Sequence, residues 1–195
     1  MKPILSILTP GIPTRMTQIT ELCNNLAEQI GNSPVEHLVL IDNRKRTIGE
    51  KRDALLRAAK GSYVAFCDDD DFPYSNYVST ILKASESNPD VITFNQYVDY
   101  NGQTGEVYFK LGHPNEGFKP GGITLRNAWH VCAWRRSIAV MSSFPASNYG
   151  EDWAFASKLC QIEGLKEVHI DEVIHKYIHN AATTAAPPPL TNGNL

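Results

Sequence analysis

Gly-Ser-Tyr-Val-Ala-Phe-Cys-Asp-Asp-Asp-Asp-Phe, residues 61–72, joins a short apolar run directly to four consecutive carboxylates. The run from Tyr63 to Cys67 predicts a buried strand, and Asp68 to Asp71 predict an acidic cluster where that strand ends. Adjacent anions repel one another, and carboxylate oxygens are hard ligands that suit Mg²⁺ or Mn²⁺. Open α/β sheets bind ligands at the carboxyl ends of their strands. The pattern therefore indicates a cation site at a sheet edge, and the alternative is a solvated acidic turn.

The composition fits one soluble globular domain. The chain has 195 residues, of which 42% are apolar and 20% are charged, which is enough for a sizeable core. No apolar run approaches the roughly 20 residues of a membrane span. Met1-Lys2-Pro3 leads straight into a strand and does not resemble a signal peptide. We therefore expect a protein with no transmembrane segment in the cytoplasm, or in the host cytoplasm if a phage encodes it.

The net charge does not favour a general nucleic-acid-binding protein, and the cysteine spacing does not favour a zinc-binding one. The net charge of −3 gives no global basic field for nucleic acid, although Arg44 to Arg46, Lys51 and Arg52 form a local basic group. The four cysteines are widely spaced and include no CxxC pair, so the pattern does not favour a zinc site. Apolar surroundings indicate buried free thiols.

The first half of the chain predicts a parallel sheet. Apolar runs at Ile4 to Leu8 and Val35 to Ile41 flank a helical pattern that begins near Thr14 to Thr17, which together form one βαβ unit. A second helix is predicted from about Thr47 to Lys60. Its first turns carry Lys51 and Arg52, where cations oppose the helix dipole. A nearby anion would explain them, and a solvated basic turn is the alternative.

The second half predicts a more irregular arrangement. Pro73 is expected to begin a helix after the acidic cluster, and Asn101-Gly102 is a strong turn signal between two extended segments. This turn predicts an antiparallel ribbon appended to the parallel half. Late strands are expected at residues 168–170 and 173–178, where alternation would place His175, Tyr177 and His179 on one face. Residues 181–195 are rich in Ala, Thr, Pro and Asn and are expected to form a flexible tail.

Three motifs together resemble one known family. They are the first-strand segment 7–10, the segments 48–53 and 59–71 that lead into an Asp-x-Asp motif, and Gly150-Glu151-Asp152-Trp153. The chain resembles nucleotide-sugar glycosyltransferases of the GT-A fold and is similar above all to glycosyltransferase family 2. The resemblance implies an α/β fold with a single GT-A (Rossmann-like) domain over residues 1–180. It also implies a mostly parallel central sheet with the appended antiparallel ribbon.

The family pattern implies a role for each matching residue. Asp42 would bind the base of the donor, Asp68 its ribose or a metal, and Asp70 a Mn²⁺ or Mg²⁺ ion that bridges the diphosphate. Asp152 would be the general base that deprotonates the acceptor hydroxyl. His179 would be a further metal ligand, with His175 as the alternative. The full set expected to contact the donor is Thr9, Pro10, Arg15, Asp42, Lys51, Arg52, Asp68 and Asp69.

The chemistry of sugar transfer supports such roles independently. Breaking a sugar–phosphate bond leaves a nucleoside diphosphate, whose developing charge needs a cation. A hydroxyl is a poor nucleophile and needs a carboxylate base within hydrogen-bond reach. For Glu151 and Asp152 the alternative is an ordinary pair of acids at a helix start. Four residues are expected near the acceptor, with core packing as the alternative for the tryptophans: Trp129, Trp134, Glu151 and Trp153.

The expected function is the transfer of one sugar from a nucleoside diphosphate donor, with UDP-sugar favoured, and with inversion by direct displacement. The acceptor would be a glycan precursor or a modified base in hydroxymethylated DNA, whose phosphates the group Arg44 to Arg46 could follow. Asp53 replaces the Asn that is usual in the family. Two other functions stay open. They are a non-catalytic nucleotide-sugar binding module and a nucleotidyltransferase that uses the same acidic cluster.

Overall fold

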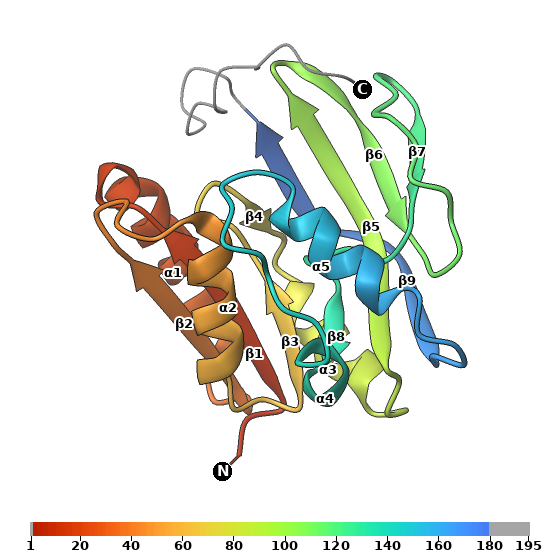
Figure 1. The fold of residues 1–195 in the computed structure, drawn as a ribbon, viewed down its shortest axis with the longest axis horizontal. Helices are drawn as coiled ribbons and strands as arrows, with labels where there is room; N and C mark the ends of the chain where they lie inside the picture. The colour runs from red at the N-terminus through yellow and green to blue at the C-terminus, as the bar shows by residue number, and fades with distance from the viewer. Residues whose placement is uncertain (1, 180–195) are drawn as a thin grey trace.

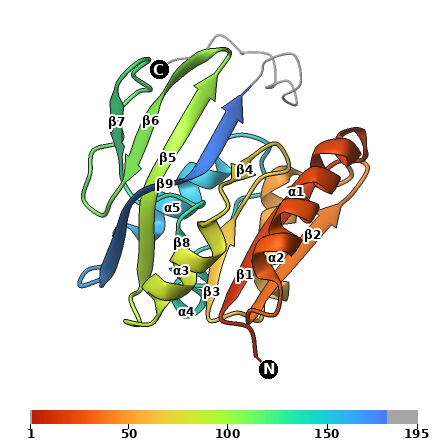
Figure 2. The same ribbon diagram turned by 180° about the vertical axis from the view of Figure 1, so that it is seen from behind.

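A computed structural model of the chain describes residues 2–179, so the predicted tail at 181–195 lies outside the described residues. Within that range, one nine-stranded mixed sheet runs through the molecule in the order β2-β1-β3-β8-β5-β6-β7, with β9 paired to β5 and β4. Helices α2 and α5 cover one face of the sheet (Figure 1), and α1 and α3 cover the other (Figure 2). The prediction of an α/β fold with a mostly parallel central sheet is confirmed.

The parallel half forms as the apolar runs predict. Strand β1 pairs in parallel with both β2 and β3, with Leu5 opposite Val35 on one side and Tyr63 on the other. All residues of β1 are buried, as expected for a central strand covered on both faces. The elements of this half are β1 (Leu5–Gly11), η1 (Pro13–Arg15), α1 (Met16–Ile30), β2 (Val35–Ile41), α2 (Ile48–Ala58) and β3 (Tyr63–Phe66).

The segment after the acidic cluster differs from its prediction. Pro73 does not begin a helix but lies in the two-residue strand β4 (Phe72–Pro73), where it faces His175 of β9. Helix α3 (Tyr77–Ser85) begins later. The backbone N–H of Tyr74 donates to Ile174, so tertiary pairing with β9 keeps the chain extended past the proline. A proline is tolerated there because β4 pairs with β9 alone and so is an edge strand.

The second half forms the appended ribbon and adds pairings that the sequence did not indicate. Strands β5 (Val91–Tyr100) and β6 (Gln103–Phe109) are antiparallel around the predicted Asn101-Gly102 turn, where both residues have positive φ. The two predicted late strands are one, β9 (Glu167–His179), whose register against β5 shifts near Asn95. The remaining elements are β7 (Ile123–Arg126), β8 (Ala133–Arg135), α4 (Arg136–Ala139) and α5 (Glu151–Leu159).

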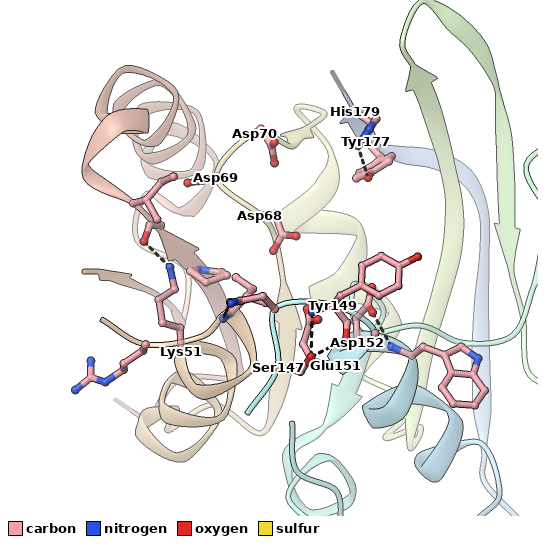
Figure 3. Close-up of a pocket in the computed structure, with 18 of the residues that line it drawn as sticks. Lys51, Asp68, Asp69, Asp70, Ser147, Tyr149, Glu151, Asp152, Tyr177 and His179 are labelled. Atoms are coloured by element: carbon pink, nitrogen blue, oxygen red, sulfur yellow. Dashed lines mark hydrogen bonds between the residues drawn. The ribbon is translucent and has the colours of Figure 1, made fainter. Parts of the chain in front are cut away.

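This topology brings separated segments to one end of the sheet. Strand β8 lies antiparallel between β3 and β5, and so joins the parallel half to the ribbon. The loop after β1, the acidic cluster after β3 and the start of α5 therefore meet around a common cavity (Figure 3). Across residues 2–179, no helix is both long enough and apolar enough to cross a bilayer.

Candidate active site

A cavity of about 1100 Å³ lies at the carboxyl ends of β1 and β3. It collects side chains from the loop after β1, the acidic cluster, the start of α5 and the end of β9 (Figure 3). Most of the residues that the sequence singled out line it: Pro10, Arg15, Lys51, Asp68, Asp69, Asp70, Trp129, Glu151, Asp152, Trp153 and His179. Thr9, Asp42, Arg52 and Trp134 do not line it.

The four aspartates of the cluster point in different directions. Arg15 pairs with Asp69 at 2.5 Å and with Asp70 at 3.0 Å, whereas Asp71 turns into the core. Burial raises the pKa of Asp70 to about 7, and the neighbouring Asp71 adds to this effect. One oxygen of Asp68 is buried with no hydrogen-bond partner among the described residues. Repelling, underpaired carboxylates of this kind gain from a bound cation.

Asp71 belongs to a second cluster beneath the cavity, with Cys67 and His175. Their ligand atoms lie within 4.8 Å of one another, and all three residues are buried. The amide of Gln96 lies 2.8 Å from His175 Nδ1, Nε2 of His175 lies 3.4 Å from Asp71, and the Asp68 N–H donates to Asp71. His175 thus faces the core, and the cluster supports the acidic loop. By residue type these three side chains could hold a metal ion, and a thiol and an imidazole are softer ligands than the carboxylates of Asp68 and Asp70.

Arg52 connects the acidic cluster to α5. It donates to Asp68 at 2.8 Å and lies 3.3 Å from Glu151, and its side chain is 4% exposed. Burial works to lower the pKa of Arg52, but Asp68 and Glu151 outweigh it and raise that pKa. Burial also raises the pKa of Glu151, against the effect of Arg52. Glu151, expected beside the acceptor, therefore has its carboxylate engaged by the arginine.

Asp152 faces the cavity from the first turn of α5. Its Oδ2 lies 3.3 Å from the indole nitrogen of Trp129, and its Oδ1 accepts from the Trp153 backbone N–H. His130 Nδ1 lies 3.9 Å away. Burial lowers the pKa of His130 to about 4, so this ring is neutral at pH 7. No pattern in the sequence indicated His130, because its position depends on the loop before β8.

Asp42 and Lys51 form the end of the site nearest β2. Asp42 accepts the backbone N–H of Arg46, and Lys51 Nζ lies 3.8 Å from its other oxygen and donates to Gly11. That oxygen of Asp42 has no hydrogen-bond partner within the described part of the chain. Thr9 is fully buried and donates to the Cys67 carbonyl, so it holds β1 to β3 and does not face the cavity.

The aromatic residues divide between core and cavity. Trp134 is 1% exposed and donates to the Trp129 carbonyl, so its predicted contact with an acceptor is wrong. Core packing of the largest apolar side chain next to β3 explains this position. Trp153 is 56% exposed and Tyr149 is 77% exposed, and both line the cavity. Exposed aromatic rings at a cavity suit stacking against a ring of a ligand.

His179 lies at the cavity end of β9 (Figure 3). Its ring stacks on Tyr100 with centroids 4.3 Å apart, and its Nδ1 lies 3.5 Å from the Tyr177 hydroxyl. Among residues 2–179, no group of three metal-ligating side chains within 4.8 Å contains His179 together with Asp68 and Asp70. Its expected role as a metal ligand stays a prediction.

The sheet order, the helices on both faces and the acid-lined cavity define a GT-A type of α/β protein. The family model described as "Glycosyl transferase family 2" matches residues 19–141, which is more than half of the chain. The chain belongs to this family, so the resemblance inferred from the motifs is confirmed. No curated protein sequence matches the chain.

Solved structures of S. aureus TarS share this fold. TarS 1–349 in complex with UDP-GlcNAc has a TM-score of 0.63 and 17% identity over 92% of this chain and 59% of that one. TarS 1–349 in complex with UDP has a TM-score of 0.62 and 17% identity, over 93% of this chain and 61% of that one. The structure of S. aureus TarS has a TM-score of 0.59 and 16% identity, over 93% of this chain and 37% of that one. The chain thus spans less than two thirds of these TarS chains, and the likeness concerns the fold.

Proposed function

We propose that the chain is a glycosyltransferase that moves one sugar from a UDP-sugar to an acceptor hydroxyl. The observation that carries this proposal is that one cavity contains both an acidic cluster, Asp68 to Asp70, and a separate carboxylate, Asp152. Family membership supports sugar transfer. The complexes of TarS with UDP-GlcNAc and UDP support a uridine nucleotide as the donor group.

Asp70 and Asp68 would hold a Mn²⁺ or Mg²⁺ ion. The unpartnered oxygen of Asp68 and the raised pKa of Asp70, about 7, fit this assignment because a cation would relieve both. Mg²⁺ is commonly held by one or two carboxylates together with substrate phosphates. The bound ion would offset the charge of the departing diphosphate. Asp42 would accept a hydrogen bond from the base, since one of its oxygens is buried and unpartnered among the described residues.

Asp152 would act as the general base. As the acceptor oxygen forms its bond to the anomeric carbon and the diphosphate leaves, Asp152 takes the hydroxyl proton, and direct displacement inverts that carbon. The Trp129 indole and the Trp153 backbone N–H each hold one carboxylate oxygen, which fixes its orientation. Tyr149 and Trp153 would stack on the acceptor, which is a glycan precursor or a modified base in hydroxymethylated DNA.

A nucleotide-release assay with two carboxamide variants tests this proposal. A panel of nucleotide sugars is screened for Mn²⁺- or Mg²⁺-dependent release of nucleoside diphosphate. We expect Asp70→Asn to abolish both release and metal-linked UDP binding, since it removes a metal ligand. We expect Asp152→Asn to retain UDP binding and to lose transfer. Asp53→Asn is the matched control, because Asp53 lies on α2 and pairs with Arg57 outside the cavity.

Three results would contradict the proposal. Unchanged turnover in Asp70→Asn would remove the metal site from the mechanism. Donor binding without nucleotide release in the wild type would favour a non-catalytic binding module, and release of pyrophosphate instead would favour a nucleotidyltransferase.

A further inference from the structure

Arg126 is a cavity arginine that the proposed chemistry does not use. It is the last residue of β7 and lines the same cavity as Asp152. Its guanidinium lies 5.7 Å from the centroid of the Trp129 ring. Among residues 2–179, its buried Nε has no hydrogen-bond partner, and no carboxylate lies within 4.0 Å of its nitrogens. A guanidinium that lines a cavity without a carboxylate partner is available to an anionic ligand.

The two arginines beside the acidic cluster already have carboxylate partners in the protein. Arg15 pairs with Asp69 and Asp70, and Arg52 pairs with Asp68 and Glu151. These arginines belong to the acidic cluster and offset its charge. Arg126 differs from these two arginines because it lies over the face of Trp129, has no carboxylate partner among residues 2–179 and lines the cavity, where an anion could reach it.

The position of Arg126 assigns it to the acceptor side. In the sheet order, β2 and β7 are the two ends, and they lie on opposite sides of the molecule (Figure 1). Asp42 directly follows β2, whereas Arg126 is the last residue of β7. The proposed donor base lies at the Asp42 end. Trp129 contacts both Arg126 and Asp152, so a single indole holds the arginine next to the proposed base.

We propose that Arg126 binds a phosphate group of the acceptor, so that the acceptor is a phosphorylated sugar. This inference rests on the proposed function, and it names the chemical class of the acceptor. The guanidinium fork matches two oxygens of a phosphate, and such charge-assisted pairs are stronger than neutral ones. Trp129 then sets the spacing between that phosphate and the hydroxyl that Asp152 deprotonates.

A small phosphorylated acceptor fits better than a nucleic-acid duplex. A duplex is bound through many phosphate contacts, which need a row of basic residues. The net charge is −3, and the segment around Arg126, Thr124 to Trp129, contains no other cation. Arg44 and Arg46 line the cavity too, but they follow β2, at the other end of the sheet order from β7, so they do not form a row with Arg126. The concave cavity with exposed Tyr149 and Trp153 suits one or two rings instead.

The test is a titration of inorganic phosphate into the full chain saturated with UDP and Mg²⁺, followed by calorimetry. UDP occupies the donor phosphate site, so added phosphate reports a second site. We expect wild type to bind phosphate and Arg126→Gln to bind it at least about tenfold more weakly, equal to about 1.4 kcal/mol. Arg126→Lys keeps a point charge and should be intermediate. Arg57→Gln is the control, because Arg57 is 70% exposed on α2 and should leave binding unchanged.

Three outcomes would overturn the inference. The first is that UDP-loaded wild type does not bind phosphate, and the second is that Arg126→Gln binds it as wild type does. The third is tight, steeply salt-dependent binding of a duplex oligonucleotide that Arg126→Gln weakens, which would replace the sugar phosphate by DNA. Failure of the proposed function is distinct, because UDP and Mg²⁺ would then not bind in the first step.

Discussion

Arg52 is the residue that joins the acidic cluster to α5, through its ion pairs with Asp68 and Glu151. The sequence left two interpretations open for the cations in the first turns of α2, a nearby anion or a solvated basic turn. The structure supplies these anions from the protein itself, because Arg52 pairs with Asp68 and Glu151, and Lys51 lies near Asp42. A helix dipole argument could predict that an anion is needed, but it could not say that α5 provides one, since Glu151 is distant in sequence.

Replacing Arg52 should therefore test the link between the acidic cluster and α5. We expect Arg52→Met to lower the free energy of unfolding by about 3 kcal/mol or more, because it leaves a buried carboxylate unpaired. The measurement is urea unfolding followed by circular dichroism. Arg57→Met is the control, since the Arg57 side chain is 70% exposed, and exposed ion pairs contribute about 1 kcal/mol or less. Equal losses in both variants would refute a structural role for the Arg52 pairs.

Among the helices and strands, the sequence predicted those that a repeating pattern of apolar residues within the element itself indicates. The predicted start of α2 at Thr47 is confirmed, with Thr47 and Glu50 forming reciprocal capping bonds. β4 and β7 were not predicted, because their pairing depends on distant strands. β7 lies parallel to β6, and side chains of the intervening loop, such as Glu116, hold it by accepting the Leu125 backbone N–H. Such a loop has no repeating pattern of apolar residues from which its structure could be predicted.

The cap of α2 gives a prediction at this scale. Thr47→Ala removes the oxygen that accepts the Glu50 N–H, and should lower the free energy of unfolding by about 1 kcal/mol. Thr20→Ala is a matched control on α1, because the Thr20 hydroxyl only donates back to Met16 within the helix. That change should be neutral or slightly stabilising. If Thr20→Ala costs as much as Thr47→Ala, the capping bonds do not account for the effect. Urea midpoints at constant m-value are the readout.

For the whole molecule, the sequence predicted which residues gather at one end of the sheet but not how the sheet is completed. Asp68 to Asp70 and Asp152 share a cavity, as the motifs implied. Strand β8 joins the two halves by antiparallel pairing with β3 and β5. This insertion displaced Trp134 from the expected acceptor side into the core. Strand order depends on packing of the whole sheet, so local pattern could not predict it.

The pH dependence of stability is a property of the whole molecule and gives the last prediction. Burial lowers the pKa of His37 and of His130 to about 4. Because the unfolded chain binds these protons near about pH 6.5, whereas the folded chain does not, each histidine lowers stability as pH falls through the window from about 6.5 to 4. Asp70, whose pKa burial raises to about 7, acts in the opposite direction, so the total curve does not isolate either contribution.

The difference between wild type and a His37 variant does isolate one of them. Between about pH 7 and pH 5, His37→Gln should lose about 2 kcal/mol less unfolding free energy than wild type, because glutamine does not titrate. Gln can also still reach the Thr9 hydroxyl, which lies 2.9 Å from His37 Nε2. Above about pH 7 both states of His37 are neutral, so the two curves should run parallel. Parallel curves below that pH as well would show that His37 takes up its proton equally in the folded and unfolded chains.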